Sequence, residues 1–187
     1  MKNVLKLLIF SDIFIGTGMG LTSPIMAIFI KDSLIGGTIA AAGIASAIFL
    51  LVKSFFQIII SKRFNPQDRL WLLIVGTFFM SIVPFIWAFS THIWHIYLAQ
   101  AFFGIASAMA SPAFSALFIL NISRKKPGYE WSIYSTSVSI GTGIAAYSGA
   151  VLASIIGFQY VFFLTGLMAL IGALILIKLT SEKIKQK

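Results

Sequence analysis

Six apolar stretches, each long enough to cross a lipid bilayer, dominate this sequence. They run over about 4–30, 37–61, 70–90, 93–121, 130–156 and 158–179. An α-helix needs roughly 20 apolar residues to span the hydrocarbon core of a membrane. Hydrophobic residues make up 59% of the 187 residues and charged residues only 10%, which leaves too little polar surface for a water-soluble domain. We therefore predict an all-α polytopic membrane protein with one six-helix domain over residues 1–187.

The basic residues between these stretches predict the orientation of the chain. Twelve of the 14 lysines and arginines lie near the two termini or in the breaks after the second and fourth stretches. Lys31 lies in a break on the opposite side, and Lys53 lies inside the second stretch. The positive-inside rule then places both termini in the cytoplasm, and we expect the plasma membrane. This distribution explains the net charge of +9 without a nucleic-acid partner.

A segment of the first stretch resembles a segment of the fourth. "DIFIGTGMGLTSP" (12–24) aligns without gaps to "QAFFGIASAMASP" (100–112), with identical residues at four positions. The two stretches cross the membrane in opposite directions, which predicts an inverted repeat of three plus three helices. The repeats cover about 1–90 and 91–180, and a short basic tail follows at 181–187. Pro24 and Pro112 are expected to kink their helices at matching places.

Polar and small residues gather on one helical face in the second, fourth and fifth stretches, whereas the third and sixth are poor in polar groups. We expect the first, second, fourth and fifth helices to share a common face, and the third and sixth to face lipid most. Two interpretations of that face compete. Small residues are the usual packing surface between membrane helices, as in Gly16-x-x-x-Gly20 and Gly104-x-x-x-Ala108. Large polar groups favour a water-filled substrate cavity instead. The cavity candidates are Asp12, Lys53, Gln57 and Gln100, with Ser107, Ser111 and Ser139 behind them.

A lysine inside an apolar stretch requires an explanation, because a charge at bilayer depth is energetically costly. Asp12 and Lys53 lie at equal depths, about 12 Å from the cytoplasmic ends of their helices at 1.5 Å per residue. Consecutive helices are usually neighbours, so we predict an Asp12–Lys53 ion pair. Two alternatives remain open. Lys53 reaches the headgroups with its long stem, or Asp12 acts as a proton-coupling carboxylate.

Several segments together resemble the N-terminal six-helix half of a major facilitator superfamily transporter. They are "GTGMGLTSPIMAIF", "YLAQAFFGIASAMASPAFSAL" and "GTGIAAYSGAVLASIIGFQYVFF", and they carry the resemblance over nearly the whole chain. The resemblance implies that the first and fourth helices line a central cavity and that the second and fifth lie between two halves. The loop "SKRFNPQDR" departs from the family pattern: Asn65 stands where the family has Asp, Asp68 where it has Gly, and only Arg69 fits.

The resemblance implies a secondary-transporter half-unit that moves a small solute by alternating access. One half forms only one wall of a cavity, so we expect a parallel homodimer or a second half-transporter chain as the partner within the lipid bilayer. The alternative is a non-transporting interaction or scaffold protein built on the same fold. We predict no enzymatic activity, no cofactor and no metal site.

Overall fold

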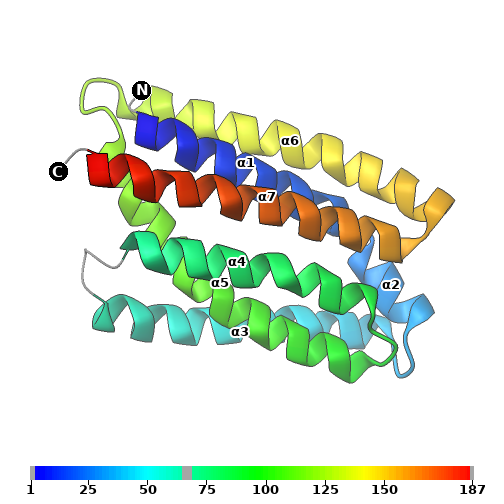
Figure 1. Cartoon of the computed structure of the whole chain (residues 1–187). Helices are drawn as coiled ribbons and strands as arrows, with labels where there is room; N and C mark the ends of the chain where they lie inside the picture. Colours follow the sequence, from blue (N-terminus) through cyan, green and yellow to red (C-terminus); the bar gives the residue numbers. More distant parts are fainter. Residues whose placement is uncertain (1–2, 65–68, 186–187) are drawn as a thin grey trace.

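The six predicted spans form helices in the computed structural model, which describes residues 3–64 and 69–185. Six helices in this part of the chain are long and apolar enough to cross a membrane, as predicted, and the chain is an integral membrane protein. The elements are α1 (Asn3–Thr22), α2 (Met26–Ser33), α3 (Ile39–Arg63), α4 (Arg69–Ala88), α5 (Ile93–Asn121), α6 (Pro127–Ile156) and α7 (Phe158–Lys185). The start of α1 and the end of α7 lie at the same end of the bundle, called here the termini end (Figure 1).

The first span consists of two helices because a proline interrupts it. Three turn residues, Ser23 to Ile25, separate α1 from α2 around Pro24, and the Ile25 amide bonds to the Thr22 carbonyl at 3.2 Å. Proline lacks an amide hydrogen and clashes with the preceding turn. Pro112, its counterpart in the predicted repeat, lies inside the continuous helix α5. Pro24 therefore interrupts its span, whereas Pro112 does not.

The helices pack with α4 and α7 in the middle and with α3 and α6 at opposite edges (Figure 1). Helix α4 contacts α5 and α7, and α7 also contacts α1, while α3 packs on α5 and α6 packs on α1. Exchanging the first three spans with the last three turns the α4–α5 contact into the α7–α1 contact and the α3–α5 contact into the α6–α1 contact, and it leaves the α4–α7 contact unchanged. This pattern is the one that an inverted repeat would give, and the repeat itself stays a prediction.

Burial within the chain does not follow the polarity of the spans. Half of the apolar window of α4 is buried and 44% of that of α7, compared with 6% for α3 and 17% for α6. Within one chain the third and sixth spans are thus more buried than the second and fifth. The expectation that they face lipid most stays a prediction, because a second half would cover the exposed faces of α3 and α6. Apolar side chains gain no solvent-driven preference for either protein or lipid inside a bilayer, so a polar-poor helix packs centrally as readily as it faces lipid.

Small residues allow the helices to approach closely, as the packing interpretation predicts. A methyl carbon added to Gly104 would lie 2.9 Å from the Phe49 carbonyl oxygen of α3, and one added to Gly20 would lie 2.9 Å from the Thr142 carbonyl oxygen of α6. Hydroxyl groups bond to backbone carbonyls at the same kind of crossing. Thr165 Oγ1 donates to the Gly18 carbonyl at 3.0 Å, which joins α7 to α1.

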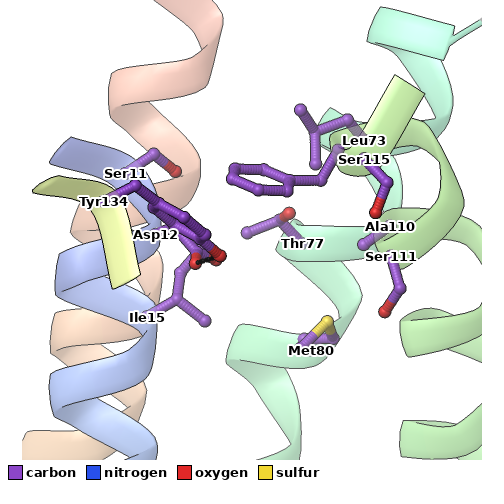
Figure 2. A pocket seen from close by; sticks show the side chains of 11 residues that line it. Ser11, Asp12, Ile15, Leu73, Thr77, Met80, Ala110, Ser111, Ser115 and Tyr134 are labelled. Carbon is purple, nitrogen blue, oxygen red and sulfur yellow. Dashed lines mark hydrogen bonds between the residues drawn. The ribbon is translucent and has the colours of Figure 1, made fainter. Parts of the chain in front are cut away.

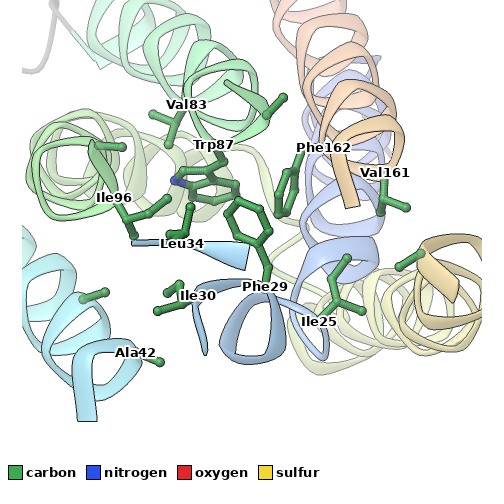
Figure 3. Close-up of a cluster of buried hydrophobic side chains, with 14 of the residues drawn as sticks. Ile25, Phe29, Ile30, Leu34, Ala42, Val83, Trp87, Ile96, Val161 and Phe162 are labelled. Carbon is green, nitrogen blue, oxygen red and sulfur yellow. The ribbon is translucent and has the colours of Figure 1, made fainter. Parts of the chain in front are cut away.

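The end opposite the termini is closed by an aromatic cluster and by paired loops. The ring centroids of Phe29 and Phe162 are 4.8 Å apart and those of Trp87 and Phe162 are 5.9 Å apart, which joins α2, α4 and α7 (Figure 3). The Ile35 amide donates to the Thr91 carbonyl at 3.0 Å, and the Ile93 amide donates to the Ile35 carbonyl at 3.1 Å. We call this end of the bundle the closed end.

Candidate functional site

A cavity of about 230 Å³ lies between α1, α4, α5 and α6. Its polar side chains are Ser11, Asp12, Thr77, Ser111, Ser115 and Tyr134. Figure 2 shows Asp12 and Tyr134 on one side and Ser111 and Ser115 on the other, with Thr77 of α4 between them. Helices from both predicted repeats therefore contribute to one partly polar hollow inside the span region.

The most polar contact in this cavity joins α1 to α6. Tyr134 Oη donates a hydrogen bond to Asp12 Oδ2 at 2.7 Å, a length typical of a hydroxyl bonded to a charged acceptor. Both side chains are half-buried. Asp12 lies about three turns into α1 and Tyr134 about two turns into α6, and these two helices run in the same direction. Tyr134 fixes one oxygen of the Asp12 carboxylate and leaves the other one for a different partner.

The predicted ion pair between Asp12 and Lys53 does not form. Salt bridges among residues 3–64 and 69–185 do not include this pair. The neighbour assumption fails because the break at Pro24 divides the span: α2 contacts α3, whereas α1 packs on α6 and α7. The Lys53 ammonium instead lies 5.8 Å from the centroid of the Phe49 ring, one turn earlier in α3.

The remaining candidates lie in several places. Ser111 lines the cavity, and its Oγ is 3.3 Å from that of Ser107, which is buried behind it. Gln100 is also buried on α5 but lies nearer the closed end, Gln57 is half-buried on α3, and Ser139 is exposed on α6. Of the seven cavity candidates, the structure places Asp12 and Ser111 in the wall of this cavity. The roles of the others stay predictions.

The atypical loop between the second and third spans is only partly described. Arg69 is the first residue of α4, and it lines a separate pocket of about 260 Å³ together with Ser61 and Phe64. Asn65 and Asp68 lie outside the described residues. The predicted loop motif therefore stays a prediction.

Four polar cavity residues were not among the sequence candidates: Ser11, Thr77, Ser115 and Tyr134. Tyr134 was missed because it lies off the face of small and hydroxyl residues on the fifth span. Its depth in the span, similar to that of Asp12, was the available signal. Thr77 belongs to a span that was assigned to lipid. Ser11 had no signal, because its role is a hydrogen bond from its Oγ to the Gly172 carbonyl at 2.8 Å, a contact between α1 and α7 that only the fold reveals.

Comparison with known proteins gives consistent results. The family model described as Major Facilitator Superfamily matches residues 8–187. An uncharacterised MFS-type transporter of Methanocaldococcus jannaschii is 24% identical over 84% of this chain and 40% of the relative. The multidrug resistance protein MdtG of Proteus mirabilis is 24% identical over 97% of this chain and 46% of the relative. The chain thus spans less than half the length of these curated relatives.

A solved structure shows the same fold. The crystal structure of the POT family transporter PepTSo superposes with a TM-score of 0.71 and 16% sequence identity, over 94% of this chain and 37% of that one. At this identity the likeness concerns the fold alone. It matches the arrangement of the six spans to part of a larger transporter.

Proposed function

We propose that this chain, which belongs to the major facilitator superfamily, is a transporter half-unit that moves a small solute by alternating access. The observation that carries the proposal is the partly polar cavity at Asp12, walled by α1, α4, α5 and α6 within the span region. An intramembrane carboxylate next to such a cavity is typical of substrate and ion pathways. One relative named as an MFS-type transporter and another named as a multidrug resistance protein support the same interpretation.

The opposite wall of the transport path has to come from a second six-helix half, and we propose a second copy of the chain. The helices at the two edges, α3 and α6, have broad apolar faces that the rest of the chain leaves uncovered. Leu51 is 71% exposed on α3 and Ile144 is 65% exposed on α6. In a parallel dimer with its twofold axis along the membrane normal, α3 of one copy faces α6 of the other.

Orientation follows from the charges. With most basic residues near the termini end, both termini lie in the cytoplasm and the paired loops lie outside the cell. In an antiparallel dimer, one copy would have its basic termini end outside the cell, contrary to the positive-inside rule. The parallel arrangement in the plasma membrane is therefore the one we propose.

Cysteine labelling tests the cavity, and the chain has no native cysteine to interfere. Ser111→Cys is expected to react with a membrane-impermeant maleimide in oriented vesicles, because the cavity admits water. Ile171→Cys is the matched control, since Ile171 is 43% exposed on α7 and does not line the cavity. Alternating access further predicts that position 111 becomes reachable from each side of the membrane in turn. Equal labelling of the two variants would contradict a water-filled cavity.

Crosslinking tests the dimer. Two differently tagged copies, one with Leu51→Cys and one with Ile144→Cys, are expected to form a mixed disulfide in lipid vesicles. A pair that carries Ile171→Cys in place of Ile144→Cys serves as the control and is expected to stay uncrosslinked. A monomer in both mild detergent and lipid would favour the non-transporting scaffold instead.

A further inference from the structure

The Asp12 carboxylate has no basic neighbour in its cavity. Tyr134 provides a neutral hydroxyl, and among the described residues that line the cavity none is a lysine, arginine or histidine. Lys53, the intramembrane lysine, lies on α3 next to Phe49 and does not line this cavity. An ionised carboxylate at bilayer depth without a cationic partner is strongly unfavourable in a medium of low dielectric constant, so a cation bound beside it would stabilise it.

The other walls of the cavity suit a cation with an apolar body. Phe114 and Tyr134 both line the cavity, and their ring centroids are 5.5 Å apart. Aromatic faces attract ammonium groups through their quadrupole. Met80 adds a polarisable thioether, and the hydroxyls of Thr77 and Ser111 can accept hydrogen bonds from N–H groups. An anion in the same place would face the carboxylate at close range.

We propose that this cavity binds a small organic monocation, an ammonium group on a compact apolar body, with its charge against Asp12 and its body against Phe114. The proposal rests on the transporter function given above and specifies the class of solute. The part of the cavity that lies within one chain measures about 230 Å³, below the roughly 300–1,000 Å³ of sites for drug-sized molecules, and it suits a compact ligand. Neutral solutes of the same shape lack the electrostatic contribution.

Choline and its neutral isostere 3,3-dimethylbutan-1-ol provide the direct test, since they share a shape and differ in charge. Both are titrated into the purified full chain in mild detergent, and the Tm is followed at constant ionic strength. Choline is expected to raise the Tm in a saturable manner, and the isostere is expected not to. Equal shifts with both compounds, or no shift with either, would overturn the proposal.

Variants locate the binding site. Asp12→Asn is expected to raise the half-maximal choline concentration at least about tenfold, equivalent to 1.4 kcal/mol. Asp32→Asn is the matched control, because Asp32 is the other acidic residue of the same span, is 55% exposed and lies beside Lys31 at the far end. It is expected to bind choline like the wild type. An unchanged choline response in Asp12→Asn would overturn the proposal.

A second variant keeps the proposal testable if Asp12→Asn does not fold. Phe114→Leu keeps an apolar side chain and removes the aromatic face, so it is expected to weaken choline binding and to leave the isostere without effect. Unchanged choline binding in this variant would contradict the placement of the ligand. The labelling of Ser111→Cys distinguishes a failure of the proposed solute class from a failure of the proposed transport cavity. A water-accessible position 111 without a choline effect rejects the solute class alone, whereas an inaccessible position 111 rejects the transport cavity as well.

Discussion

Tyr134 and Asp12 are joined by a 2.7 Å hydrogen bond although 122 positions separate them in the sequence. The bond ties α6 to α1 at the wall of the cavity. Tyr134→Phe removes the donor and leaves the ring, so we expect a loss of roughly 1–3 kcal/mol in the free energy of unfolding. Tyr129→Phe is the control, because Tyr129 is 65% exposed. A double-mutant cycle with Asp12→Ala, which removes the acceptor, should show strong coupling when unfolding is measured in mild detergent. Additive effects would speak against the bond.

For Asp12 and Lys53 we expect no energetic coupling, in contrast to Asp12 and Tyr134. Because Asp12 and Lys53 are not paired, Asp12→Asn and Lys53→Met should change stability independently, within about 0.5 kcal/mol of additivity. The measurement is the same unfolding cycle. A coupling well beyond that limit would show that the two side chains meet in a state other than the one described here.

Gly104 should not tolerate a larger side chain. In Gly104→Ala the added methyl would meet the backbone of α3 at Phe49 and Lys53, and we expect a destabilisation of about 1–3 kcal/mol from overpacking. Gly143→Ala is a matched control, since nothing lies within 4 Å of the added carbon on α6. That variant should be neutral or slightly stabilising, because alanine favours helices. Thermal unfolding of the two proteins compares them, and an equal loss in both would exclude the contact with α3 as the cause.

Thr165→Val tests an interhelical bond in the core of the bundle. Thr165 is fully buried and donates to the Gly18 carbonyl, and the change keeps the shape of the side chain. Bonds of this kind inside membranes average about 0.6 kcal/mol and reach about 1.7, so we expect a loss within that range. Thr136→Val, at an exposed position of α6, should cost less. Equal unfolding midpoints for wild type and Thr165→Val would show that the bond contributes nothing.

The orientation can be checked with a reporter on either tail. A fluorescent protein that matures only in the cytoplasm, fused after Lys187, should be bright in intact cells. A periplasm-dependent enzyme reporter at the same position should be inactive. The reverse result would overturn the cytoplasmic placement of the termini and, with it, the predicted sidedness of every loop.

Periodic features of the sequence predicted the fold well. Contacts between helices that are distant in the sequence were harder to predict. Span number and length follow from runs of apolar residues, and the close approaches at Gly20 and Gly104 follow from small residues at helical spacing. The cavity was predicted in part: Asp12 and Ser111 line it. The ion pair was wrong because equal depth does not imply adjacency, and α1 contacts α6 instead of α3. The central position of α4 within the chain was not predicted, because polarity alone does not say which helices pack together.

The paired loops at the closed end have a consequence for how freely the sequence can vary there. Ile35 contributes only its main-chain amide and carbonyl to the pairing with Thr91 and Ile93, and its own side chain is 69% exposed. Nineteen of the twenty amino acids carry both main-chain groups, so the side chain at this position can change during evolution without loss of these two hydrogen bonds. Proline is the exception, because it lacks the amide hydrogen that bonds to the Thr91 carbonyl. It would therefore weaken the link between the α2–α3 loop and the α4–α5 loop.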